Sequence, residues 1–99
     1  MKKQILLSVL VLLPLLASAD TVKIGELWYN INTVGGFAEV KYADPNASLL
    51  NAHVIIPENV IYEEVEYPVT KICDYAFEEE NLAAITIPKS VVSIGFNAF

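Results

Sequence analysis

A segment of this chain occurs twice, and this internal repetition restricts the possible folds more than any other feature of the sequence. Residues 69–77 and 91–99 align at a spacing of 22 residues and share valine, isoleucine, alanine and phenylalanine at matching positions. A second similarity relates residues 54–57 to residues 85–88 at a spacing of 31, because nine additional residues around positions 63–64 lengthen the first copy. Repetition at such a period is typical of a solenoid, in which each unit buries its apolar face against the next unit.

The segments before the repeat have the composition and alternation of β-strands. Residues 22–31 are rich in β-branched and aromatic side chains and predict one strand. Residues 32–36 contain two glycines and predict a turn, and residues 37–42 alternate apolar with charged side chains, which predicts a second strand. The two strands would form a hairpin. Its second strand would place three side chains on one face, namely Ala38, Val40 and Tyr42.

Shorter strands are expected further along the chain. Residues 53–57 predict a strand that a proline ends, and residues 60–62 and 65–67 flank two glutamates as the arms of a second hairpin. No apolar pattern with a period of 3.6 residues continues long enough to predict a long helix. The best helical candidate is one or two turns at residues 74–77. The expected fold is therefore mainly β, with an N-terminal β-hairpin leader and short helical turns in the repeats.

The repeat resembles the unit of the BspA-like leucine-rich repeat family. Residues 72–77 and 82–99 follow that family's pattern, I-G-x-x-A-F and then L-x-x-I-x-I-P-x-S-V-x-x-I-G, except that Cys73 stands where glycine is usual. The resemblance implies a leader over residues 20–68 and an incomplete leucine-rich repeat solenoid over residues 69–99. It also implies an exported, often surface-displayed protein that acts in adhesion or interaction and not as a catalyst.

Stacking would divide the side chains of each repeat between a core and a concave surface. The core would include six residues of the second copy, namely Leu82, Ile85, Ile87, Ile94, Ala98 and Phe99. The alternating positions would point outward along neighbouring parallel strands and line the concave face, where solenoids usually bind. The candidate binding residues on this face are His53, Ile55, Ala84 and Thr86.

The N-terminus has the pattern of an export signal. Two lysines precede an apolar run over residues 5–16, and residues 17–19, Ala-Ser-Ala, have the small side chains of a cleavage site. The apolar run is shorter than the ~20 residues that a transmembrane helix needs. We therefore expect a signal peptide over residues 1–19, a cut after Ala19, and a secreted or cell-surface location. An uncleaved anchor is the alternative.

The charge of the chain argues against nucleic-acid binding. The whole chain has a net charge of −6, and removal of the export segment with its two lysines leaves −8, with no arginine. A surface of this sign repels phosphate groups.

The expected partner is a host or community surface macromolecule, with a protein favoured and a glycan as the alternative.

The residue types that catalyse reactions or bind metals form no recognisable motif. Cys73 could be a nucleophile with His53, the single histidine, as its base, but a thiol at a small turn position beside the core is expected to be buried and inert, or paired with another chain. The acidic runs at residues 63–66 and 78–80 lack the ligand spacing of a calcium loop. No catalytic residue, metal or cofactor is therefore expected, and the single cysteine excludes an internal disulfide.

The end of the chain raises a separate expectation. The sequence has about one and a half repeats, and its last residue, Phe99, stands at a core position. We expect the front of a longer protein, in which further repeats cover this edge. A short chain that covers the edge with a second copy is the alternative.

The expected function follows from these features together. It is non-catalytic adhesion or protein–protein interaction at the cell surface by an exported leucine-rich repeat protein. One alternative is a structural or capping module of a surface assembly. Another is a carbohydrate-binding module built on an aromatic platform of Trp28, Tyr29, Tyr62 and Tyr67, although packing within the sheet is the simpler role for these side chains.

Overall fold

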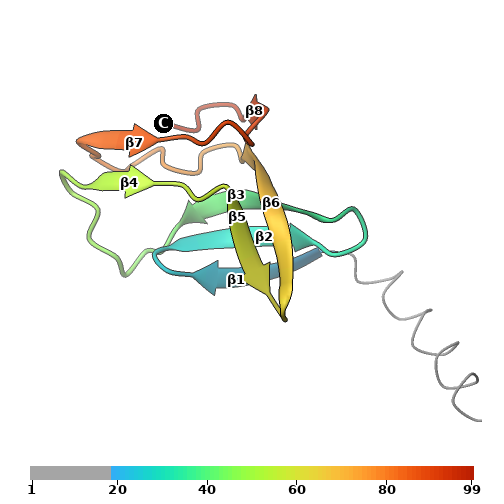
Figure 1. The fold of residues 1–99 in the computed structure, drawn as a ribbon. Helices are drawn as coiled ribbons and strands as arrows, with labels where there is room; N and C mark the ends of the chain where they lie inside the picture. Colours follow the sequence, from blue (N-terminus) through green and yellow to red (C-terminus); the bar gives the residue numbers. More distant parts are fainter. Residues whose placement is uncertain (1–18) are drawn as a thin grey trace, which may run out of the picture.

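The structure, a computed structural model, describes residues 19–99 as eight β-strands joined by turns, with no helix in this range. The strands are β1 (Ala19–Ile24), β2 (Leu27–Asn32), β3 (Phe37–Ala43), β4 (His53–Ile55), β5 (Asn59–Tyr62), β6 (Val65–Ile72), β7 (Ala84–Thr86) and β8 (Ser93–Ile94). Figure 1 shows β1, β2 and β3 as one sheet, with β4 and β7 paired beside it. The mainly-β prediction is confirmed, whereas the signal peptide expected over residues 1–19 lies outside the described residues apart from Ala19. None of the described residues forms a helix long and apolar enough to cross a membrane.

The short helical turns expected at residues 74–77 are not found in the described part of the chain. The segment forms consecutive turns, and Tyr75 has a φ of 61°. This left-handed conformation interrupts a right-handed helix. The backbone N–H groups of Tyr75 and Phe77 donate to the carbonyl oxygens of Phe96 (3.0 Å) and Ala98 (2.7 Å) in the next repeat. Contact between repeats therefore satisfies backbone groups that a helix would satisfy within itself.

The first predicted strand, residues 22–31, is two strands in the structure. β1 and β2 pair antiparallel along their whole length, and Gly25 and Glu26 form the turn between them. Gly25 has a φ of 65°, a conformation that glycine adopts without the steric cost of a β-carbon. The continuous strand-like composition conceals this hairpin, and Gly25 is the residue that marks it.

The predicted hairpin of β2 and β3 is confirmed, but a β-bulge changes which side chains of β3 face the core. Trp28 pairs with Tyr42 whereas Tyr29 pairs with Val40, so one residue of β3 between these pairs has no partner. Beyond the bulge the alternation shifts by one residue, which buries Ala43 and exposes Tyr42. The expectation that Tyr42 shares a face with Ala38 and Val40 is therefore wrong.

Parallel pairing connects the leader to the repeats. β6 pairs with β3 through Ile72 and Val40, and with β8 through Ile72 and Ile94, so these three residues lie in one ladder. In each of these two pairs, the residue after the later partner donates its N–H to the carbonyl oxygen of the earlier partner. The N–H of Cys73 donates to the Val40 oxygen (2.8 Å), and the N–H of Gly95 donates to the Ile72 oxygen (2.7 Å). β3 therefore occupies the place that the strand of a preceding repeat would have.

The other two strand pairs also follow the sequence pattern. β4 and β7, which contain the similarity at a spacing of 31 residues, pair in parallel. β5 and β6 form the second predicted hairpin, and their turn consists of Glu63 and Glu64. Each pair contributes one or more residues to the buried core, so the leader and the repeats are packed together.

One apolar cluster joins the leader to the repeats. Its buried members are Leu27, Tyr29, Ile31, Ala38, Val40, Ala43, Leu49, Val54, Ile56, Val60, Tyr67, Val69, Ile72, Ala76, Phe77 and Ala98. Of the other predicted core residues, three are partly buried against this cluster, namely Leu82, Ile85 and Ile87. Ile94 and Phe99 are 51% and 52% exposed, so their predicted burial is wrong for this chain. The reason is that no unit among residues 19–99 packs beyond them, although the Phe99 ring stacks on Phe77 at 5.7 Å.

The turn between β5 and β6 carries backbone strain that substitution can relieve. Glu63 and Glu64 have φ values of 51° and 69°, the signature of a type I′ turn, which favours Asn-Gly. We expect the double substitution Glu63→Asn with Glu64→Gly to raise the free energy of unfolding by about 1–2 kcal/mol in urea denaturation. The matched control, glutamine at both positions, removes the charges and keeps the strain. An equal gain in that control would assign the effect to charge instead.

Candidate functional site

The four predicted binding residues lie together on the exposed face of β4 and β7. His53 is opposite Ala84, and Ile55 is opposite Thr86 in the parallel register. All four side chains are exposed, whereas Val54, between the first two, is buried. A hydrogen bond of 2.8 Å joins the Nε2 atom of His53 to the Oγ1 atom of Thr86 and links the two strands. The structure therefore brings the four residues onto one surface, which we call the β4–β7 face.

A groove of about 330 Å³ lies next to this face, between the β1–β2 turn and β4. Its lining comes from the end of β1, the turn and β2 (Ile24, Gly25, Glu26, Leu27 and Tyr29), from the loop between β3 and β4 (Leu49), and from β4 and the residues after it (His53, Val54, Ile55 and Pro57). Buried side chains form much of this lining. The groove is not predictable from the sequence, because its first wall is the β1–β2 hairpin, which only Gly25 marks. We call it the β4 groove.

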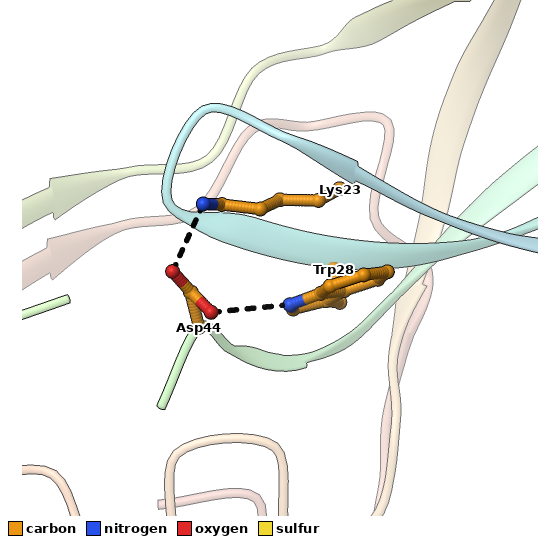
Figure 2. Close-up of polar contacts among 3 residues, drawn as sticks. All are labelled: Lys23, Trp28 and Asp44. Atoms are coloured by element: carbon orange, nitrogen blue, oxygen red, sulfur yellow. Dashed lines mark hydrogen bonds and ion pairs between the residues drawn. The ribbon is translucent and has the colours of Figure 1, made fainter. Parts of the chain in front are cut away.

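Three side chains hold the wall of the β4 groove in place (Figure 2). The Nζ atom of Lys23 lies 3.0 Å from Oδ2 of Asp44, and the indole N–H of Trp28 donates to Oδ1 of the same carboxylate at 3.4 Å. The hydrogen bond from Lys23 is the main reason why the pKa of Asp44 lies below its usual value. The backbone N–H of Asp44 also donates to the oxygen of Glu26 (2.9 Å). These contacts tie the β1–β2 turn to the loop that supplies Leu49.

One of the residues that line the β4 groove, Tyr29, has a buried side chain with a polar hydroxyl group. Tyr29 is only 2% exposed, yet the structure gives its hydroxyl no hydrogen-bond partner among residues 19–99. No fully buried side-chain oxygen or nitrogen in this range lacks a partner, so the hydroxyl retains contact with solvent. Burial raises the pKa of Tyr29 from 10.0 to about 12. Tyr29 is therefore a lining residue of the groove whose hydroxyl has no hydrogen-bond partner among residues 19–99.

The structure does not assemble the aromatic platform considered for carbohydrate. Tyr29 and Tyr67 are buried in the core. Tyr62 donates its O–H to Oδ2 of Asp20 at 2.8 Å, and this hydrogen bond is the main cause that raises the pKa of Tyr62 to about 12. Trp28 instead lies beside the exposed ring of Tyr42, with the ring centroids 6.2 Å apart.

Cys73 has the surroundings of an unreactive thiol. Its Sγ atom is 3.7 Å from a carboxylate oxygen of Glu39 on β3. Burial, and then the charge of Glu39, raise the pKa of Cys73 from 9.0 to about 11. A catalytic thiol needs the opposite shift, toward a stable thiolate at neutral pH. Among the described residues, no three histidine, cysteine, aspartate or glutamate side chains gather in a way that could hold a metal ion.

The raised pKa of Cys73 has a measurable consequence. At pH 8 the thiolate fraction is about a hundredfold lower than for an unperturbed thiol, which outweighs the greater nucleophilicity of each thiolate. We expect alkylation by iodoacetamide at least about tenfold slower in the folded protein than in urea. Because the Glu39 charge favours the neutral thiol, Glu39→Gln should lower the pKa and speed the folded-state reaction. Equal rates for folded and unfolded protein would contradict the assignment.

Comparison with known proteins identifies two similar structures. No protein-family model and no curated protein matches this sequence. A leucine-rich repeat protein from Bacteroides capillosus is 37% identical, with a TM-score of 0.68, and the match covers 80% of this chain and 56% of that one. A leucine rich cell surface protein from Faecalibacterium prausnitzii is 28% identical, with a TM-score of 0.67, and the match covers 81% of this chain and 20% of that one.

These matches confirm the resemblance that the 22-residue repeat indicates. The chain is similar to bacterial leucine-rich repeat proteins in both fold and sequence over four fifths of its length. It spans about half the length of the first of these proteins and a fifth of the second. The match extends beyond residues 69–99, since this segment alone is shorter than the covered share of the chain.

Proposed function

We propose that this chain, which is similar to bacterial leucine-rich repeat proteins, is a non-catalytic binding module of an exported surface protein and binds a macromolecular partner through the β4–β7 face. The observation that carries the proposal is the common exposure of His53, Ile55, Ala84 and Thr86 on two parallel strands in register. Residues in such a register form a continuous surface. A protein partner fits this surface best, because it can make many small contacts at once.

Two further observations support export and surface display. The N-terminal sequence has the charged, apolar and small-residue regions of a signal peptide, with the proposed cut after Ala19. The similar protein from Faecalibacterium prausnitzii is described as a cell surface protein. Adhesion to a host or community macromolecule is therefore the biological role that we propose for the whole protein.

Binding to immobilised extracellular-matrix proteins tests the proposed function. We expect saturable binding that Ile55→Lys and Thr86→Lys weaken by about tenfold or more, because each places a long charged side chain on the β4–β7 face. Ile61→Lys is a matched control, since Ile61 on β5 is 68% exposed and Ile55 is 67% exposed. Loss of binding to the same degree in the control would argue against this face as the binding surface.

A structural role is the second candidate, and one observation favours it. Val92, Ile94, Phe96 and Phe99 are exposed apolar residues at the end of the repeat segment. Such a patch marks a surface that further repeats or a second copy of the chain would cover. Sedimentation velocity over a range of concentrations tests whether a second copy of the chain covers this patch. A concentration-dependent dimer that Phe96→Asp abolishes would support the second copy.

A further inference from the structure

One edge of β4 faces away from β7. β4 pairs with β7 on one side, and no other strand among the described residues pairs with it. Ala52 accepts hydrogen bonds from Ala83 (2.9 Å) and Ala84 (3.3 Å), and the N–H of Ile56 donates to Thr86 (3.0 Å), so these even-numbered residues turn their backbone groups toward β7. Backbone groups alternate in direction along a strand.

Alternation fixes the direction of the intervening backbone groups. The N–H and C=O groups of His53 and Ile55 point away from β7, toward the side where the β4 groove lies. Neither residue has a backbone hydrogen bond to another described segment outside the β4–β7 pair. Pro57, which has no N–H, ends this edge. The free edge is therefore short and has both donors and acceptors.

The groove beside the edge complements these backbone groups. It is about 330 Å³ in volume and is lined mainly by apolar side chains, and the buried Tyr29, whose hydroxyl has no partner among residues 19–99, is one of its lining residues. Its only charged lining residue is Glu26, and no lysine contributes to it. An occupant would therefore have an apolar side chain, a carbonyl oxygen for the hydroxyl, and positive charge nearby.

We infer that the β4 groove binds an extended, lysine- or arginine-flanked peptide segment of a partner protein, which adds to β4 as a further strand. The segment would pair with the backbone of His53 and Ile55 and place an apolar side chain in the groove near the Tyr29 hydroxyl. Strand addition of this kind obtains affinity from main-chain hydrogen bonds and specificity from the side-chain pocket. The inference rests on the proposed binding function and extends it from the face of β4 to its edge.

The experiment uses short peptides that alternate valine and threonine between terminal lysines. Titration into the isotope-labelled chain is followed by amide chemical shifts and by hydrogen exchange. We expect the His53 and Ile55 amides to exchange rapidly in the free protein and to become protected when the peptide binds. N-methylation of alternate peptide amides, on the edge that would pair with β4, should weaken binding by about tenfold or more. Replacing the lysines with glutamates should also weaken it.

Substitutions distinguish the contribution of backbone hydrogen bonds to peptide binding from the contribution of side chains. Ile55→Pro removes the N–H at the free edge and should weaken binding much more than Ile55→Ala, which keeps it. Tyr29→Phe should weaken binding several-fold, whereas Tyr67→Phe, a buried tyrosine outside the groove, should leave it unchanged. Amide spectra of each variant establish that it is folded.

Three outcomes would overturn the inference. The first is equal affinity for methylated and unmethylated peptides, or no binding by either. The second is a set of shifts confined to Ala84 and Thr86, which would keep the proposed function and reject the edge. The third is exchange protection of Ile55 in concentrated protein alone, which dilution removes, because a second copy would then occupy the edge. Failure of matrix binding with intact peptide binding would instead reject the proposed adhesion role.

Discussion

Replacing Gly95 with alanine is expected to lower the free energy of unfolding by about 3 kcal/mol. A β-carbon at Gly95 would overlap the Oδ1 atom and the backbone nitrogen of Asp74, and it would lie 2.7 Å from the carbonyl carbon of Cys73. These atoms cannot move freely, because the Asp74 carboxylate accepts the N–H of Phe96 (2.7 Å) and the N–H of Gly95 itself donates to Ile72. The added methyl group would therefore separate the two repeats. Urea denaturation measures the loss.

A control distinguishes close contact from backbone strain. Gly25 has a positive φ, but no atom lies within 4 Å of the position of its β-carbon, so Gly25→Ala should cost only about 1 kcal/mol. Gly95 has no positive φ, and its sensitivity should come from contact alone. Equal losses for the two alanine variants would contradict this explanation.

The same comparison explains why Cys73 replaces the usual glycine of the repeat. Cys73 is the counterpart of Gly95 one repeat earlier, but its neighbour is β3 and not another repeat. Its thiol lies beside Glu39, where there is room for a side chain. The departure from the family pattern is therefore a local consequence of the contact with the leader.

Appending a second copy of residues 78–99 after Phe99 is expected to raise the free energy of unfolding by about 3 kcal/mol. The added unit would cover Ile94 and Phe99, which are half-exposed, as β8 and its turn cover Ile72 and Phe77. The stabilisation comes from apolar area that the next unit removes from water. Thermal and urea denaturation of both chains measure the gain.

The control for this extension has the same length and a polar interface. Serine replaces every leucine, isoleucine, valine and phenylalanine of the appended copy, which removes the large apolar side chains and keeps the added chain. We expect no gain from it. If the polar copy stabilised the protein as much as the apolar copy, the exposed end would not be an incomplete core.

Much of the β-structure was predictable because the sequence repeats and alternates locally. The β2–β3 hairpin follows from turn residues between two strand-like segments, and the β5–β6 hairpin follows from two apolar segments on either side of a glutamate pair. The β4–β7 pairing follows from the similarity at a spacing of 31 residues. The bulge was not predictable, because a one-residue slip depends on pairing between strands and leaves no local pattern. The β1–β2 hairpin was not predictable, because Gly25 is the only residue that interrupts the strand-like composition of residues 22–31.

The candidate site, too, is predictable from the sequence only in part. The exposure of His53, Ile55, Ala84 and Thr86 follows from alternation along two strands and could be predicted. The β4 groove could not, since its walls come from segments that are distant in the sequence and meet only in the folded chain. The unused Tyr29 hydroxyl could not either, because burial and hydrogen bonding are properties of the whole core.

The ladder through Val40, Ile72 and Ile94 predicts an order in which the strands fold. Once β2 and β3 have formed their local hairpin, the other edge of β3 is available for pairing. β6 can then pair in parallel with β3 as a template, and β8 can pair with β6. A chain that emerges N-terminus first would therefore complete each unit on the unit before it. Pulsed hydrogen exchange should show amides of the β2–β3 hairpin protected before those of β8, and the reverse order would reject the template. The leader would then act as the nucleus from which the array grows in one direction.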